Sequence, residues 1–180
     1  MKRIFVAVLI SKELQGEIFA WEQNFKSNPN SPIRWVEPKN LHVTLVPPFG
    51  DASGLRPIID SLKTVKAESF NIRFESISFG PDRNRPRMIW ATGQALQKIE
   101  DLRYKIYGAL GREPEKRPFR LHATLARFKP EDFAGFPIKN FDEKTDWRQK
   151  VDSFVLMESH LSAQGADYEI LEKFELSDKA

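Results

Sequence analysis

The chain contains no cysteine, and no stretch of it comes near the roughly 20 consecutive apolar residues that cross a bilayer. Without cysteine it can form neither a disulfide framework nor a thiolate metal site, which suits a reducing compartment. The apolar run within residues 3–10 is too short for a secretory signal, and no small-residue cleavage site follows it. We therefore expect a cytoplasmic protein with no membrane partner.

A glycine-rich turn is also missing after the first expected strand, where the sequence reads VLISKEL. Phosphate-binding loops of kinases and of dinucleotide-binding folds depend on such turns, so both classes are excluded. Apolar residues are plentiful: 41% of the 180 residues are hydrophobic and 12% are aromatic. This is enough to build one core, and we expect residues 1–180 to form a single domain made of two lobes.

Positive charge is concentrated in the middle of the chain. Residues 83–120 hold ten Lys or Arg against four Asp or Glu, although the whole chain has a net charge of only +3. Such a basic segment could attract a polyanion such as RNA. A run of this kind is more often a solvated loop, and charge alone does not decide between the two interpretations.

Apolar residues recur with the periods of both strands and helices. Residues 3–10 are apolar on both faces, as in a central strand, and Ser11 can cap a following helix. In residues 70–79 the alternation shifts, which indicates a bulge near Glu75 and Ser76. We expect further strands at 87–92, 151–158 and 168–176, the last with Tyr168, Ile170, Phe174 and Leu176 on one face, and helices that include residues 14–25, 55–65 and 96–110, the last ended by Gly111. This order indicates an α+β fold with largely antiparallel sheets.

Two of the three histidines lie in the same five-residue frame, LHVTL at residues 41–45 and LHATL at residues 121–125. If each copy is a strand, its two leucines and its central residue point to the core, while the histidine and the threonine share the other face. A lone histidine on a strand is usually structural or solvated, and we assign that role to His160, which lacks the frame. For His42 and His122 the repetition favours two lobes related by a pseudo-twofold axis, with both His/Thr pairs facing a shared cleft.

Two imidazoles and two hydroxyls suit a reaction at phosphorus. One imidazole can be neutral and accept a proton while the other is protonated and donates one. The hydroxyls of Thr44 and Thr124 can bind the oxygens of a tetrahedral phosphate. A zinc hydrolase would need a further ligand, and neither frame contains Asp, Glu or Cys. The pattern therefore predicts an in-line displacement by an acid–base pair without a metal.

At these residues the chain resembles the 2H phosphoesterase superfamily, which carries paired His-x-Thr-x motifs. It is most similar to the RNA 2′,3′-cyclic phosphodiesterases, also called 2′-5′ RNA ligases, because RWVEPKNLHVTL (34–45), RPFRLHATLARF (117–128) and SHLSAQGADYEILEKFEL (159–176) look like family segments in family order. The resemblance implies a bilobal α+β fold with the cleft between the lobes, no cofactor, and an RNA or nucleotide partner with a 2′,3′-cyclic phosphate end.

The same resemblance implies the reaction and the role of each residue. The cyclic phosphate is hydrolysed to a 2′-phosphate, and reversible 2′-5′ ligation stays open. His122 would be the general base that activates water, and His42 the general acid that protonates the departing 3′ oxygen. Thr44 and Thr124 would bind the phosphate. We expect such an enzyme to act as a monomer.

The sequence departs from the family pattern at two places. Leu121 stands where the family often has proline, and TLVPPFG follows the first histidine where the family often has TLKFLG. Arg127 matches a family arginine, but strict alternation places it on the face opposite His122 unless the strand has ended or bulged. Arg120 has the favourable parity, so both arginines are candidate substrate-binding residues.

A non-catalytic module that binds RNA ends is the alternative function. The basic residues 83–120, with aromatic side chains such as Trp35 or Phe119, could hold a single strand by charge and stacking. These aromatic residues could equally lie in the core. Hydrolysis of a nucleoside 2′,3′-cyclic phosphate in EDTA would distinguish the enzyme from the module.

Overall fold

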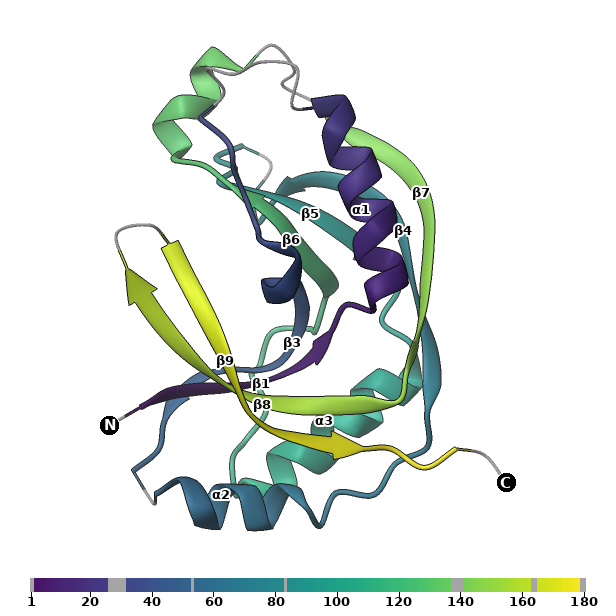
Figure 1. Ribbon diagram of the computed structural model, residues 1–180, viewed down its shortest axis with the longest axis vertical. Coiled ribbons are helices and arrows are strands. Elements are labelled where there is room, and N and C mark those ends of the chain that lie inside the picture. The colour runs from purple at the N-terminus through teal and green to yellow at the C-terminus, as the bar shows by residue number, and fades with distance from the viewer. Residues whose placement is uncertain are drawn as a thin grey trace.

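Two antiparallel sheets and the helices packed on them make up the computed structural model (Figure 1), which describes residues 2–25, 32–52, 54–82, 84–136, 141–162 and 165–178. The first sheet has the strand order β3 (His42–Gly50), β1 (Arg3–Leu9), β8 (Ser153–Ser162) and β9 (Gly165–Glu175). The second has the order β2 (Arg34–Trp35), β6 (Leu121–Arg127), β5 (Met88–Gly93), β4 (Phe70–Gly80) and β7 (Asp142–Val151). This arrangement confirms the predicted α+β fold.

The helices cover the two sheets from different sides. Helix α1 (Lys12–Phe25) lies along β4 and β7 of the second sheet, whereas α2 (Leu55–Leu62) and α3 (Gln97–Ala109) lie below the first sheet (Figure 1). Two short 3₁₀ helices, at Pro38–Asn40 and Pro130–Gly135, precede β3 and follow β6. None of the helices in the described part of the chain is both long and apolar enough to cross a membrane.

The predicted helix ends are present. Ser11 Oγ accepts a hydrogen bond from the backbone N–H of Leu14 at 3.2 Å, which caps α1. At the end of α3, Gly111 has φ of 60° and the N–H of Arg112 donates to the carbonyl of Tyr107 at 3.0 Å. A positive φ of this size favours glycine, so Gly111 ends the helix as expected.

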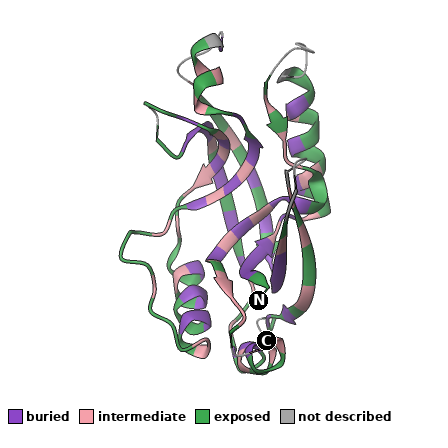
Figure 2. Cartoon of the chain, turned by 90° about the vertical axis from the view of Figure 1, so that its left-hand side faces the viewer, coloured by how far each residue is buried: buried purple, intermediate pink, exposed green. Residues whose placement is uncertain are grey.

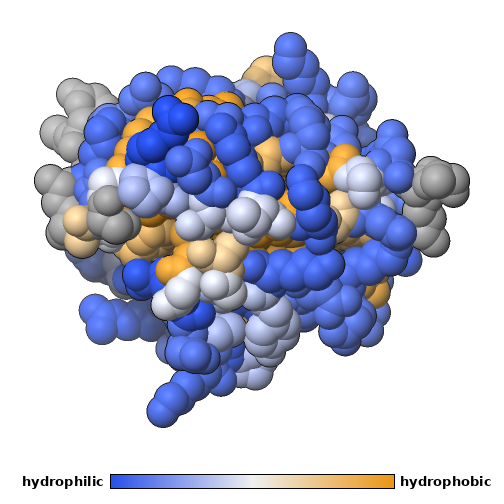
Figure 3. Space-filling model, turned by 90° about the horizontal axis from the view of Figure 1, so that it is seen from below, coloured by the Kyte–Doolittle hydropathy of each residue, from blue (hydrophilic) through white to orange (hydrophobic). Residues whose placement is uncertain are grey.

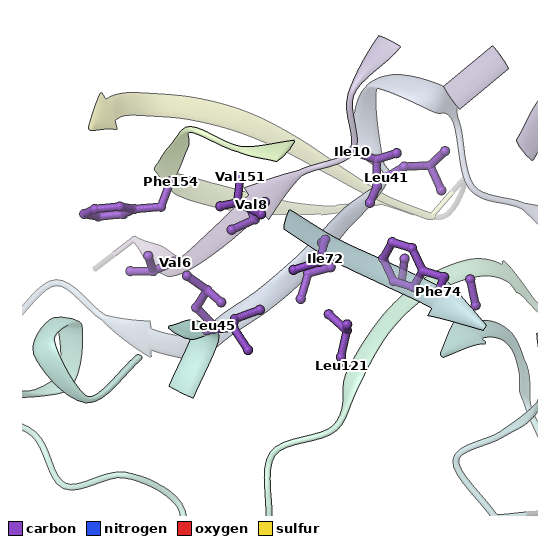
Figure 4. Packing of buried hydrophobic residues seen from close by; sticks show 14 of the residues in the cluster. Val6, Val8, Ile10, Leu41, Leu45, Ile72, Phe74, Leu121, Val151 and Phe154 are labelled. Carbon is purple, nitrogen blue, oxygen red and sulfur yellow. The ribbon is translucent and has the colours of Figure 1, made fainter. Parts of the chain in front are cut away.

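The two sheets share one core. Val6, Val8 and Leu45 of the first sheet pack against Ile72 and Leu121 of the second in the same cluster of buried side chains (Figure 4). Buried residues, drawn in purple, lie mainly on the strands and on the covered helix faces (Figure 2). Burial of each such aliphatic side chain stabilises the fold by about 1.5–3 kcal/mol. This common core fixes the position of one sheet against the other.

Strand β1 is buried on both faces, as its continuous apolar run predicts. Ile4, Val6 and Val8 belong to the shared core, whereas Phe5 and Ala7 belong to a second, smaller cluster that includes Val155 and Met157 of β8 and the partly buried Tyr168 of β9. The second cluster lies on the face of the sheet that also carries His42, because the His42 ring contacts Phe5. Seen from below, the side on which α2 and α3 lie, the surface of the molecule is mostly hydrophilic (Figure 3).

Alternation along the last strand predicted the wrong face for some of its side chains. The register between β8 and β9 shifts between the pairs Leu156/Glu172 and Met157/Ile170. A shift of this kind leaves one extra residue on β9 and reverses the face of the residues beyond it. Phe174 and Leu176 therefore lie in the shared core, whereas Tyr168 packs on the smaller cluster and Ile170 is 50% exposed. The prediction that all four side chains share one face is wrong.

Strand β7 was not predicted, although an irregularity opposite it was. The register between β4 and β7 shifts between Phe74 and Ser76, at the predicted place, but the extra residue lies on β7, because Glu75 faces both Thr145 and Asp146. The β7 sequence DEKTDWRQKV is mostly charged or polar, and only Trp147, Gln149 and Val151 turn a buried face to the core. A strand with so few apolar residues gives a weak sequence signal.

Candidate active site

The repeated frame is a repeat of backbone structure as well as of sequence. In the β1–β3 pairing, Val6 pairs with Val46 and Ala7 with Thr44, so Leu45 is left out of the register. In the β5–β6 pairing, Ile89 pairs with Ala126 and Trp90 with Thr124, so Leu125 is left out. Each histidine strand thus has a β-bulge at the residue after its threonine.

Burial follows the predicted alternation up to the bulge in each copy. Leu41, Val43 and Leu45 are buried, and the same holds for Leu121, Ala123 and Leu125. His42, Thr44, His122 and Thr124 are each half-buried on the other face of their strands. The residue after the bulge is buried again, Val46 in one copy and Ala126 in the other, which shows that each bulge inverts the alternation.

Residues from both copies line one cavity of about 640 Å³. His42 comes from β3, Thr124 and Arg127 come from β6, and Tyr168 comes from β9. The strands β3 and β6 lie next to each other, one from each sheet. The lining of this cavity, as far as the described residues go, does not include Thr44 or His122.

The His42 ring is held by one hydrogen bond and two aromatic contacts. Nδ1 lies 2.7 Å from the backbone carbonyl of Asn40, and the ring centroid lies 5.2 Å from Phe5 and 5.1 Å from Tyr168, the latter nearly edge to face. When Nδ1–H donates to this carbonyl, Nε2 carries the lone pair that can exchange a proton. Burial lowers the pKa of His42 from 6.5 to about 4, and the Asn40 carbonyl only partly opposes this effect.

His122 is held in an equivalent way. Its Nδ1 lies 2.9 Å from the carbonyl of Arg120, which is again two residues earlier in the chain. Its ring packs against Trp90 in a tilted arrangement, with centroids 4.2 Å apart and an angle of 35°. Burial lowers the pKa of His122, the Arg120 carbonyl opposes this, and the positive charges of Arg120, Arg117 and Arg127 lower the pKa further.

Both imidazoles are therefore neutral near pH 7 when nothing is bound. The charge of each ring also disfavours the charge of the other, since His122 contributes to the lowered pKa of His42. A bound phosphodiester anion would oppose these effects and raise both pKa values.

The two arginines occupy different places. Arg127 lines the cavity with His42 and Thr124. The bulge at Leu125 turns Arg127 to the same face of β6 as Thr124, whereas strict alternation predicts the opposite face. Arg120 lies just before β6, is exposed, and lines a second cavity of about 640 Å³ that includes Trp90 and Phe119. The favourable parity expected for Arg120 does not apply, because the residue precedes the strand.

The basic segment divides into exposed and internal cations. Arg112, Arg117 and Arg120 are exposed. Arg103 is 6% exposed, donates to the carbonyl of Leu45 at 3.1 Å and pairs with Glu100 at 2.7 Å, so its role is structural. Arg83, which also belongs to the segment, lies outside the described residues.

The two aromatic residues considered for RNA stacking are both half-buried. Trp35 lines the His42 cavity, and its ring also contacts Trp21 at 5.9 Å between centroids. Phe119 lines the second cavity, with the guanidinium of Arg103 4.1 Å from its centroid. Each therefore has one side in the fold and the other beside a cavity.

His160 belongs to a group of ion pairs at the β8–β9 hairpin. Its Nε2 lies 3.1 Å from Glu169 and 4.0 Å from Glu158, and Lys2 Nζ lies 2.6 Å from the same Glu158 oxygen. The potential ligand atoms of the three residues lie within 4.8 Å of one another, but the ammonium of Lys2 already neutralises Glu158. The Lys2–Glu158 ion pair and the hydrogen bond between His160 and Glu169 account for these contacts without a metal ion.

Three residues around the site were not identified from the sequence: Tyr168 and Trp90, which contact the histidines, and Met88, which contacts Thr124 and Arg127. Tyr168 was hidden by the bulge in β9, and Trp90 and Met88 were assigned to a strand without any indication that the strand borders the site. Gly80 makes room for Trp90, since a Cβ at Gly80 would lie 2.6 Å from the indole. An aromatic residue paired with a histidine strand is a signal that could have pointed to Trp90.

The chain is similar to proteins of one family along most of its length. The family model described as the 2'-5' RNA ligase superfamily matches residues 12–163. The RNA 2',3'-cyclic phosphodiesterase of Bacillus subtilis (strain 168) is 31% identical, with 96% of each chain covered. The protein of the same name from Aeropyrum pernix is 31% identical over 78% of this chain and 84% of its own length.

Solved structures show the same fold. A protein of Thermus thermophilus superposes with a TM-score of 0.78 at 24% identity, covering 99% of this chain and 100% of its own. LigT of E. coli, solved in complex with 3'-AMP, gives a TM-score of 0.74 at 21% identity and covers 98% of both chains. At these identities the likeness concerns the fold alone, and it agrees with the two-sheet arrangement described above.

Proposed function

The chain belongs to the 2'-5' RNA ligase superfamily and is an enzyme, and from this premise we propose that it hydrolyses the 2′,3′-cyclic phosphate of an RNA or nucleotide to a 2′-phosphate. The observation that carries the proposal is that His42 of one repeat lines the same cavity as Thr124 and Arg127 of the other. The names of the relatives in Bacillus subtilis and Aeropyrum pernix support the same reaction.

The mechanism uses the two imidazoles at their Nε2 atoms. The backbone carbonyls of Asn40 and Arg120 hold the Nδ1 atoms, so both rings present Nε2 for proton exchange. In the roles implied by the resemblance, Nε2 of His122 takes a proton from water as the water attacks phosphorus. Nε2 of His42 gives a proton to the departing 3′ oxygen. The bond from phosphorus to the 2′ oxygen stays intact.

Charge explains why the site works only with its anionic substrate. Burial lowers the pKa of His42 to about 4, so near neutral pH its imidazolium is a good proton donor that forms when the phosphate lies beside it. Arg127 and the hydroxyl of Thr124 are placed to bind the nonbridging oxygens, where negative charge grows in the transition state. Since these groups supply the stabilising charge, we propose that the reaction needs no metal.

The proposal is tested by product analysis with an RNA that ends in a 2′,3′-cyclic phosphate, incubated with the protein in EDTA. Formation of a 2′-phosphate is the expected result. A 3′-phosphate would contradict the proposed regiochemistry, and binding without turnover would favour the alternative RNA-end-binding module.

Three single substitutions test the assignment of the histidines. His42→Ala and His122→Ala are each expected to lower the rate by roughly 10²–10⁴, because each removes one proton transfer. His160→Ala is the matched control, since this third histidine lies in the ion-pair group of the hairpin. Full activity in either of the first two variants, or an equal loss in the third, would eliminate the acid–base pair.

Ligation by the same displacement, with a 5′-hydroxyl as the nucleophile, is the second candidate activity. A 5′-hydroxyl in the place of the attacking water would be joined to the cyclic phosphate through a 2′-5′ linkage, with the same two proton transfers. Incubation of two RNA fragments, one ending in a cyclic phosphate and one in a 5′-hydroxyl, would detect it. If no joined product forms at high fragment concentration, hydrolysis is the only reaction of the two.

A further inference from the structure

Three hydrogen-bond donors of the site converge on one sulfur atom. Sδ of Met88 lies 3.2 Å from Nε1 of Trp90, 3.6 Å from a terminal guanidinium nitrogen of Arg127 and 3.9 Å from the hydroxyl of Thr124. The strand register explains the arrangement, because Met88 pairs with Arg127 and Trp90 pairs with Thr124 across β5 and β6. Met88 therefore stands beside two of the groups to which the proposed function assigns the phosphate.

A thioether is a weak acceptor, so it holds these donors only loosely. The hydroxyl of Thr124 and the guanidinium of Arg127 can leave the sulfur for a phosphate oxygen, which accepts far stronger, charge-assisted hydrogen bonds. In the ligand-free protein Met88 thus keeps the donors gathered at one point without competing with the substrate.

The chemistry of the chain makes this sulfur distinctive. The sequence has three methionines and no cysteine. Met157 is fully buried in the small cluster with Phe5, and Met1 lies outside the described residues. Met88 is half-buried. In the described part of the chain it is the one sulfur that a small oxidant could reach without prior unfolding.

We propose that Met88 is a site of reversible oxidation that controls phosphate binding. A hydroperoxide transfers one oxygen to the sulfur: the sulfur lone pair attacks, the O–O bond breaks, a sulfoxide forms, and the peroxide leaves as water or an alcohol. The sulfoxide is polar and its oxygen is a much stronger acceptor than the thioether. It takes the hydrogen bonds of Thr124 and Arg127, which are then lost to the substrate.

The inference rests on the proposed function for its effect on turnover, but phosphate binding tests it separately. The wild-type protein, Met88→Leu and the matched control Met157→Leu are treated with graded hydrogen peroxide. Sulfoxide at each methionine is measured by mass spectrometry of peptides. Hydrolysis of a nucleoside 2′,3′-cyclic phosphate and the affinity for inorganic phosphate are measured on the same samples, each relative to its own untreated protein.

In the wild-type protein, oxidation of Met88 is expected to precede any at Met157. In the wild type and in Met157→Leu alike, oxidation of Met88 is expected to lower phosphate affinity and kcat/KM by about tenfold or more. Treatment with methionine sulfoxide reductase restores both, and Met88→Leu keeps its own untreated values. The proposal is overturned if Met88 resists the oxidant, if its sulfoxide leaves phosphate affinity unchanged, or if Met88→Leu loses as much as the wild type. Absence of turnover before treatment refutes the proposed function alone.

Discussion

Acidification below the ordinary histidine pKa of 6.5 is expected to destabilise the protein through His42. In the fold, the pKa of this ring is lowered to about 4 because the ring is desolvated, and in the unfolded chain the ring regains its ordinary pKa. At pH values between these two, the unfolded chain binds a proton at His42 and the folded chain does not. Stability from this group is therefore complete above pH 6.5 and is lost as the pH falls toward about 4.

The size of the effect follows from the width of this interval. At about 1.4 kcal/mol per pKa unit, the shift from 6.5 to about 4 lowers the free energy of unfolding by roughly 3 kcal/mol at the acid end of the interval. This is a large part of the 5–15 kcal/mol typical of a folded domain. His122, whose pKa is also lowered by burial, adds a loss of the same sign.

The measurement is urea unfolding of the wild type and of His42→Gln at a series of pH values across the interval. The variant lacks the titrating ring but keeps a polar side chain, so the difference between the two curves isolates His42 from the carboxylates. His160→Gln is the control, because His160 is paired at the surface with Glu169. If the wild type and His42→Gln lose stability in parallel, the ring is not desolvated in the fold and the argument fails.

Three further predictions concern the pH profile of the rate, RNA binding and stability. The rate is expected to be bell-shaped in pH, because one ring must be charged and the other neutral; a flat profile with chemistry rate-limiting would contradict this. Arg120→Gln is expected to weaken binding of an oligonucleotide that ends in a cyclic phosphate. The slope of the logarithm of its affinity against the logarithm of salt concentration is expected to fall by about one, with little effect on binding of a mononucleotide. Arg56→Gln on α2, where Arg56 pairs with Asp60, is the control, and equal salt slopes in both variants would show that Arg120 does not bind the RNA. Gly80→Ala is expected to displace Trp90 and to cost about 1–3 kcal/mol, measured by urea unfolding alongside kcat; unchanged values would show that the indole has room to move.

The sequence predicts those parts of the site that depend only on which residues are present and on the two-residue period of a strand. His42 and His122 stand out because the same five-residue frame occurs twice, and strand geometry then places Thr44 and Thr124 on the faces that the structure gives them. The cap at Ser11 was predictable for the same reason, since it depends on a local contact.

Bulges account for what the sequence could not reveal. Each inserts one residue into a strand without changing the residue types around it, so alternation continued past Leu125 puts Arg127 on the wrong face, and alternation continued through β9 does the same for Tyr168. The side chains that gather around Met88 depend on pairing between strands, which the sequence of one strand does not contain.

The duplicated bulge also breaks the symmetry that the histidines create. Two residues beyond Leu45 the first copy has the half-buried Pro47, whereas two residues beyond Leu125 the second copy has Arg127. A pocket with matched imidazoles and hydroxyls would accept a cyclic diester in either of two orientations related by half a turn. The positive charge of Arg127 on one side makes those orientations unequal in energy. We propose that this difference between the two strands contributes to the choice of which ester oxygen departs.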